Sequence, residues 1–167
     1  AAQRGQHWQV SGVVWASHSQ ETTMFKRILV PTDGSDITTK AVNTAITLAK
    51  SVGAKVFALS VKEPFPYSAI SELQPTPPQE FFDAQERIAA MRVQAVTDAC
   101  SAAGVPCEAH TVEALHPWEA IIDHAKRQEC DLLVMASHGR KGVKRLLLGS
   151  ETQQVLTHSH IPVLVLR

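Results

Sequence analysis

Residues 136–150 combine glycines with the densest group of basic side chains in the chain. Gly149 and Ser150 stand at the predicted start of a helix, where free backbone N–H groups and the positive end of the helix dipole favour an anion. Gly149 has no Cβ atom to hold a phosphate away from the backbone, and the Ser150 hydroxyl can donate a hydrogen bond. The basic side chains just before this pair, which can screen phosphate charge, are Arg140, Lys141, Lys144 and Arg145. Each residue alone also fits a turn, a helix cap or a solvated surface, but the combination predicts phosphate binding.

A second polar group, Pro31, Thr32 and Asp33, follows the first apolar run of the chain. A carboxylate at the end of a central strand can accept hydrogen bonds from a base or a ribose, and it can equally cap its own turn. These two uses of Asp33 are compatible. The sequence has neither the G-x-x-x-x-G-K-[ST] pattern of a P-loop nor the G-x-G-x-x-G pattern of a dinucleotide site.

Catalytic and metal-binding patterns are weaker. Asp33, His138 and Ser150 are the residue types of a hydrolytic triad, but Ser150 lacks the G-x-S-x-G surroundings of a nucleophile. His158 and His160 have no third ligand at a recognisable spacing. We therefore predict no catalytic residue and no metal site of the protein's own, while a Mg²⁺ or Mn²⁺ ion carried by bound phosphates stays open.

The composition is that of an ordinary globular domain, with 167 residues, of which 44% are apolar and 19% charged. The formal net charge is zero and no apolar run approaches the roughly 20 residues of a membrane span, so neither nucleic acid nor a membrane is expected as a partner. Cys100, Cys107 and Cys130 are odd in number and show no C-x-x-C spacing. This pattern favours a reducing, cytoplasmic location over a disulfide framework or a zinc site.

Apolar runs and helical periodicities alternate along the chain. Strands are predicted over residues 26–31, 55–61, 106–112, 131–135 and 162–166, and helices over residues 37–52, 79–103, 116–128 and 149–157. This alternation predicts an α/β domain with a doubly wound, mostly parallel sheet and helices on both faces. In such a sheet, ligands bind beyond the carboxyl ends of the strands. In the longest helix, the predicted buried face holds Phe82, Ile88, Met91, Ala95 and Ala99.

Residues 1–23 have no strong periodicity and precede Met24. They are interpreted as a leader, either disordered or artificially added, and the domain is predicted to cover residues 24–167.

Several segments together resemble the universal stress protein family. They are PTDGS after the first strand, ASHG followed nine residues later by GS, and the terminal IPVLVLR. The resemblance covers Met24 to Arg167. The nucleotide-binding branch of that family carries G-x2-G-x9-G-[ST]. Gly139, Gly149 and Ser150 fit this pattern, whereas Ala136 replaces its first glycine and adds only a methyl group.

The resemblance implies a five-stranded, Rossmann-like parallel sheet of strand order 3-2-1-4-5 and a site for ATP, ADP or AMP. The residues expected around the nucleotide are Pro31, Thr32, Asp33, Val61, Met135, Ala136, Gly139, Gly149, Ser150 and Thr152, with Lys141, Lys144 and Arg145 screening the phosphates. Glu151 is expected to point away from the bound anion. The function implied is that of an ATP-binding regulatory or stress-response protein. The alternatives are a nucleotide-free signalling or interaction dimer and a slow ATP hydrolase.

The last strand also predicts a homodimer, which the resemblance implies as well. In the expected strand order, Pro162–Leu166 lies at an edge of the sheet and is apolar toward both faces. Neither a charge nor an interior proline protects it before Arg167. An exposed edge of this kind can pair with its copy about a two-fold axis. The alternative is that residues 1–23 fold back over this edge, which would leave a monomer.

Overall fold

The computed structural model describes residues 24–65, 78–138 and 148–167. The predicted leader, Gly139 and the basic residues Lys141, Lys144 and Arg145 lie outside this part of the chain. The strands are β1 (Arg27–Pro31), β2 (Lys55–Lys62), β3 (Cys107–Glu113), β4 (Leu132–Ala136) and β5 (Val163–Leu166). The helices are α1 (Asp36–Val52), α2 (Gln79–Ala103), α3 (Pro117–Arg127) and α4 (Ser150–His158).

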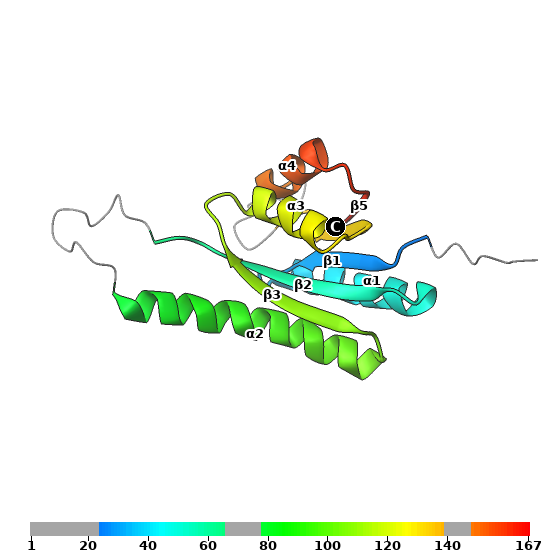
Figure 1. The fold of residues 1–167 in the computed structure, drawn as a ribbon, viewed down its shortest axis with the longest axis horizontal. Helices are drawn as coiled ribbons and strands as arrows, with labels where there is room; N and C mark the ends of the chain where they lie inside the picture. Colours follow the sequence, from blue (N-terminus) through cyan, green and yellow to red (C-terminus); the bar gives the residue numbers. More distant parts are fainter. Residues whose placement is uncertain (1–23, 66–77, 139–147) are drawn as a thin grey trace, which may run out of the picture.

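The strands form one five-stranded sheet in the order β3-β2-β1-β4-β5 (Figure 1). All four pairings are parallel. The middle residues of β1 and every residue of β4 are buried, as expected of near-continuous apolar runs covered on both faces. Both the predicted fold class and the predicted strand order are therefore confirmed.

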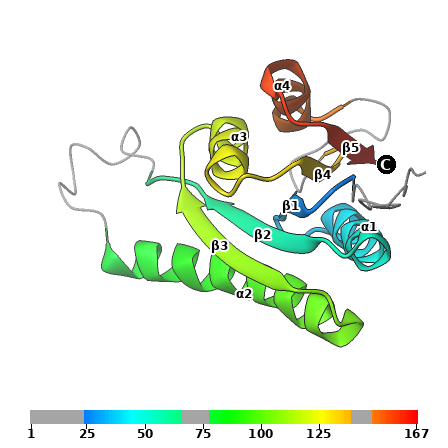
Figure 2. The ribbon, with the colours of Figure 1, turned by 45° about the vertical axis from the view of Figure 1, so that its right-hand side comes forward.

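Helices cover both faces of the sheet (Figure 2). Side chains of α1 and α2 pack with Ile28, Val30 and Val56 in one buried cluster. Side chains of α3 and α4 pack with Leu29, Phe57 and other strand residues in a second cluster on the opposite face. The strand residues in these clusters alternate between the two faces, which follows from the two-residue period of a strand.

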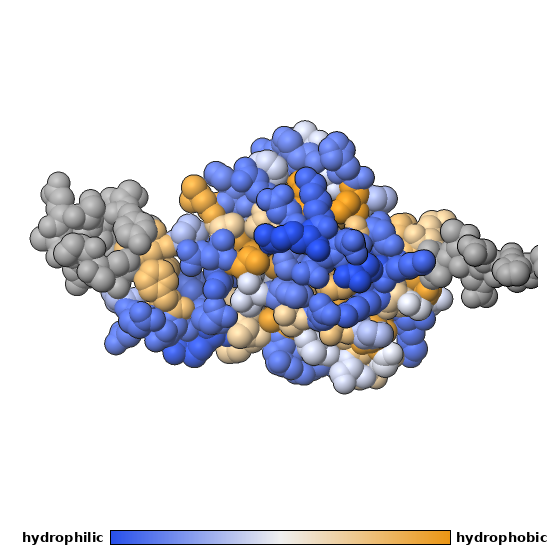
Figure 3. Space-filling model, in the orientation of Figure 1, coloured by the Kyte–Doolittle hydropathy of each residue, from blue (hydrophilic) through white to orange (hydrophobic). Residues whose placement is uncertain are grey.

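The buried face of α2 differs from the predicted one. The residues that α2 buries are Ala89, Val93, Val96 and Cys100. Met91 is instead 71% exposed and Ile88 43% exposed. Two apolar stripes run along this helix, and the stripe with smaller or β-branched side chains is the one that packs against the sheet. The view in Figure 3 shows a mostly hydrophilic surface on which apolar residues are scattered.

Candidate nucleotide-binding edge

The predicted polar segments lie together beyond the carboxyl ends of the strands, because β1 and β4 are parallel neighbours and end on the same side of the sheet. The segment after β1 contains Thr32 and Asp33, and the segment after β4 leads into Ser137 and His138. Both segments are therefore positioned where ligands bind in doubly wound sheets. Val61 lies near the end of the adjacent strand β2 and packs against the second core cluster.

The turn after β1 is fixed by hydroxyl and carboxylate groups. The N–H of Thr32 donates to Leu59 O at 2.8 Å, which attaches the turn to the end of β2. Asp33 Oδ1 accepts hydrogen bonds from the Ser35 N–H at 3.0 Å and from Thr38 Oγ1 at 3.1 Å. The predicted role of Asp33 as a cap of its own turn is therefore observed. Thr38, which sequence reasoning missed, is buried and supports this arrangement from α1.

The start of α4 is bound directly to the end of β4. The Gly149 N–H donates to Ser137 O at 2.7 Å, and Ser137 N in turn donates to Leu166 O at 2.7 Å. One turn into the helix, Thr152 Oγ1 donates to Ala136 O at 2.9 Å. Thr152 is buried and its hydroxyl serves this contact, so its side chain attaches α4 to the strand. Ser137 is not a specified position of the family pattern. It joins α4 and β5 to the end of β4 through its backbone N–H and C=O groups.

Gly149 lies in close contact with the residues just after β4. A Cβ atom at this position would lie 3.1 Å from His138 Cα and 3.2 Å from Ser137 O. The sequence predicts that the missing Cβ gives a phosphate access to the backbone. The structure adds a packing reason that holds without any ligand.

The first turn of α4 presents backbone donors. Its first intrahelical bond runs from the Gln153 N–H to Gly149 O at 2.9 Å, so the N–H groups of Ser150, Glu151 and Thr152 precede the intrahelical ladder. Ser150 is exposed at the helix start. A helix start with unused N–H groups attracts an anion.

Glu151 is the one acidic residue in this first turn, and its carboxylate binds elsewhere. Glu151 Oε2 accepts a hydrogen bond from the Trp118 N–H at 2.8 Å, in the first turn of α3. The carboxylate thus caps the start of α3 instead of the helix that carries it. This contact agrees with the expectation that Glu151 turns away from the anion position, and it also links the two helices on this face.

The residue types of a hydrolytic triad do not form a relay with Ser150. His138 Nδ1 lies 3.1 Å from Ser137 Oγ, and Asp33 Oδ1 accepts hydrogen bonds within its own turn. Both side chains therefore take part in loop-fixing contacts. Within residues 24–65, 78–138 and 148–167, no group of three His, Cys, Asp or Glu side chains is placed to hold a metal ion. None of the helices described has an apolar stretch long enough to cross a membrane.

Comparison with known proteins connects this geometry to one family. Residues 24–167 match the family model described as "Universal stress protein family". The universal stress protein MJ0531 of Methanocaldococcus jannaschii is 31% identical over 153 residues, which cover 86% of this chain and 83% of that protein. A universal stress protein of Thermus aquaticus is 33% identical over 145 residues, which cover 86% of this chain and all of that protein.

Solved structures with the same fold include protein MJ0577, with a TM-score of 0.73 and 26% identity over 86% of this chain and 96% of that one. A universal stress protein in complex with cAMP has a TM-score of 0.66 and 24% identity, and the match covers 86% of this chain and 98% of that one. A third, from Archaeoglobus fulgidus in complex with dAMP, has a TM-score of 0.64 and 17% identity, with coverages of 86% and 99%.

Proposed function

This chain belongs to the universal stress protein family, and we propose that it binds an adenine nucleotide, with ATP as the expected ligand, at the carboxyl edge of its sheet. The observation that carries this proposal is the start of α4. Ser137 O holds the Gly149 N–H, and the Glu151 carboxylate is bound to α3. The first-turn N–H groups of α4 are thereby fixed in place, with the nearest acidic group occupied elsewhere, and this is a suitable site for a phosphate.

The adenosine moiety is assigned to the segments around the end of β1. In this proposal the residues around it are Pro31, Thr32, Asp33, Val61, Met135 and Ala136. Asp33 is fixed by Ser35 and Thr38 and so presents a carboxylate of defined orientation to a base or ribose. Two of the proteins that share the fold were solved with adenine nucleotides, cAMP and dAMP, which supports an adenine nucleotide as the ligand class.

The phosphates are assigned to Gly139, Gly149, Ser150 and the backbone of Thr152. Lys141, Lys144 and Arg145 are proposed to screen their charge, with Mg²⁺ or Mn²⁺ as a companion ion of the ligand. Replacing these three basic residues by Gln should lower affinity for ATP more than for adenosine, because only ATP carries the charges that they screen. An equal loss for both ligands in calorimetry would reject this part of the assignment.

The site is tested most cleanly at Ser150, the first residue of α4. Proline is favoured at this position of a helix, and the preceding Gly149 has φ −63° and ψ 150°, which a following proline accepts. Ser150→Pro therefore removes one N–H and one hydroxyl while leaving the helix able to form. Ser150→Ala removes the hydroxyl alone.

We expect Ser150→Pro to weaken ATP binding by tenfold or more, since a hydrogen bond to a charged group contributes about 1.5–3 kcal/mol. Ser150→Ala should lie between this variant and the wild type. The measurement is isothermal calorimetry, together with chromatography of nucleotides extracted from the purified protein. Unchanged ATP affinity in a folded Ser150→Pro variant would mean that the phosphate site is wrongly placed. A wild type with neither a calorimetric signal nor extractable nucleotide would favour the nucleotide-free interaction dimer.

The assembly and location are proposed on separate grounds. Among the residues that the structure describes, β5 is the last strand in the sheet order and Leu164 on it is 38% exposed, so this strand can pair with a second copy. A homodimer through this strand is therefore proposed. The three cysteines Cys100, Cys107 and Cys130 are all unpaired thiols, which supports a reducing compartment such as the cytoplasm.

A further inference from the structure

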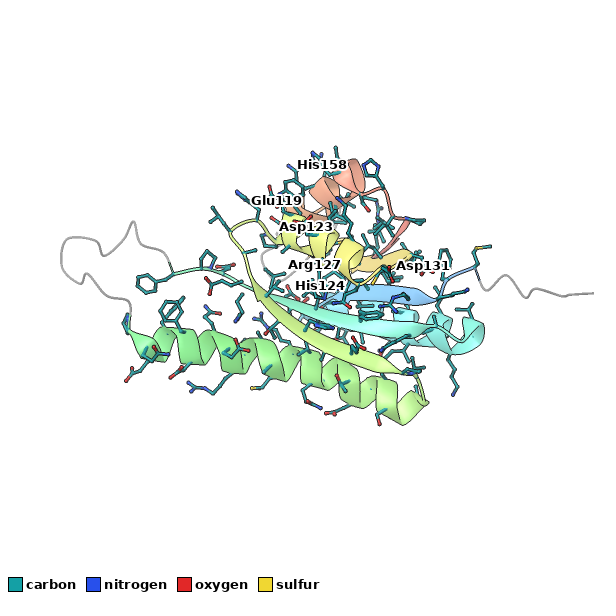
Figure 4. All side chains as sticks on the ribbon, in the orientation of Figure 1. Glu119, Asp123, His124, Arg127, Asp131 and His158 are labelled. Atoms are coloured by element: carbon teal, nitrogen blue, oxygen red, sulfur yellow. The ribbon has the colours of Figure 1, made fainter. Side chains whose placement is uncertain are left out.

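Two histidines meet beneath α3, away from the residues assigned to the nucleotide. His124 of α3 and His110 of β3 have ring centroids 4.7 Å apart, with their planes inclined by 60°. His110 also stacks on Phe57 of β2, at 6.3 Å between centroids and an angle of 18°. Figure 4 shows His124 on the side of α3 that faces the strands. The pair therefore lies in the contact between α3 and the sheet.

The imidazole of His124 is buried without a hydrogen-bond partner. The residue is 4% exposed, and both of its ring nitrogens are buried and unbonded. His110 Nε2 is also buried without a hydrogen bond, although it lies 3.4 Å from Glu108 Oε2. An unbonded buried polar group is costly, and a buried charge without a partner costs more. The neutral form of His124 is thus the form that this packing accepts.

Positive groups lie near His124 and near the Phe57 ring on which His110 stacks. Arg127 follows His124 on α3, and the Arg27 guanidinium and Lys55 ammonium lie 4.6 and 5.4 Å from the Phe57 ring centroid. The Glu108 carboxylate beside His110 also pairs with Lys55. Burial first, and then His110 and Arg127, hold the pKa of His124 below its ordinary value of 6.5.

We propose that the His110–His124 pair makes the packing of α3 on the sheet sensitive to pH, so that mild acid loosens this helix. When α3 separates from the sheet, His124 reaches water and takes up a proton that the packed state disfavours. The state with α3 separated from the sheet (open) then binds more protons than the state with α3 packed on it (closed). The closed state therefore loses stability relative to the open state as pH falls. The window begins near pH 6.5, the ordinary value for histidine, and extends below it.

The same helix is joined to the proposed nucleotide site. The Trp118 N–H in its first turn holds the Glu151 carboxylate of α4, and the Trp118 ring stacks on His158 at 4.7 Å between centroids. Loosening α3 therefore releases Glu151 beside the N–H groups assigned to the phosphates. Mild acid is expected to lower nucleotide affinity as a consequence, and this second part rests on the proposed function.

The test measures hydrogen exchange of α3 amides in the full chain at pH 7.5, 6.5 and 5.5, corrected for the intrinsic exchange rate at each pH. The variants are His124→Leu, which removes the titrating group, and His160→Gln, an exposed histidine that serves as a matched control. For one proton taken up on opening by a histidine of ordinary pKa 6.5, the opening constant of wild-type α3 should rise by up to about fivefold between pH 6.5 and 5.5. His160→Gln should behave in the same way, while His124→Leu should lose this pH dependence.

A wild-type α3 whose opening constant is unchanged across this range overturns the proposal, and so does a His124→Leu variant with the wild-type pH dependence. If His124→Leu fails to fold, nuclear magnetic resonance of the His124 ring in the wild type replaces it. A midpoint below 6.5 that coincides with loss of α3 protection supports the proposal, and titration at 6.5 with α3 fully protected refutes it. Failure of ATP to bind at any pH would reject the proposed nucleotide function and leave the exchange result standing.

Discussion

At the scale of single residues, Gly149 has two possible reasons to be a glycine, access for a phosphate and close packing, and the sequence indicates only the first. Its missing Cβ was predicted to admit a phosphate, whereas the structure also places it against the backbone of Ser137 and His138. The glycine pattern indicated the position correctly. The packing reason could not be predicted, because it depends on how closely the start of α4 approaches the residues just after β4, and no local sequence pattern shows that approach.

This packing predicts the effect of Gly149→Ala without any ligand. The added methyl group would lie 3.1 Å from His138 Cα, and the loop must shift to accept it. Overpacking of this kind costs about 1–3 kcal/mol. Thermal unfolding of the ligand-free protein should therefore show a lower midpoint for Gly149→Ala than for wild type. Ser150→Ala serves as the control at an exposed neighbouring position, and equal midpoints for all three proteins would contradict the packing account.

Asp33 shows the limit of single-residue reasoning in another way. From the sequence it could cap its own turn or bind a base or ribose, and the structure shows the first use through Ser35 and Thr38. The capping role was predictable because a carboxylate before a helix commonly bonds its own backbone. The second use depends on a ligand, and it stays a proposal.

At the scale of elements, Glu151 of α4 caps α3 across the interface between them. Glu151→Ala removes the acceptor for the Trp118 N–H, whereas Glu151→Gln keeps an acceptor oxygen. We expect Glu151→Ala to lower the free energy of unfolding by about 0.5–2 kcal/mol, the range for loss of a helix cap. Urea unfolding measures this difference. This capping role of Glu151 is refuted if Glu151→Gln is as destabilised as Glu151→Ala, or if neither variant differs from wild type.

The ends of helices were predictable where the helical periodicity stops just before a glycine. The predicted end of α1 before Gly53 and that of α2 before Gly104 are both confirmed, and both glycines adopt left-handed conformations. The buried face of α2 was predicted wrongly because the helix carries two apolar stripes. Periodicity detects each stripe, but only the distance to the sheet decides that Val93 is buried and Met91 is not.

At the scale of the whole molecule, the parallel sheet was predictable from the alternation of predicted strands and helices, and its strand order from the family resemblance. The contacts between α3 and β3 were not, because His110 and His124 stand on separate elements and neither has a motif. Their contact follows from the path of the chain, which places β3 at one edge of the sheet and α3 on the face that contains Phe57.

The other edge of the sheet, β5, carries the prediction of a homodimer. Light scattering at micromolar concentration should give twice the single-chain mass of 18.2 kDa. Val165→Lys should weaken the dimer, because it brings like charges together near a two-fold axis. Leu156→Lys, at an exposed apolar position on α4, is the matched control and should leave the dimer intact. A wild-type mass near 18.2 kDa would refute the dimer.

The central claim, an adenine nucleotide at the carboxyl edge of the sheet, is tested most directly by mapping ATP onto backbone amide resonances of the full chain. The largest shifts are expected at Thr32 to Gly34 and at Ser150 to Thr152. Little change is expected at the other ends of the strands, around Lys26 and Gly53. Saturable shifts confined to these two segments would support the site. Shifts that cluster elsewhere, or no shifts at millimolar ATP, would contradict it.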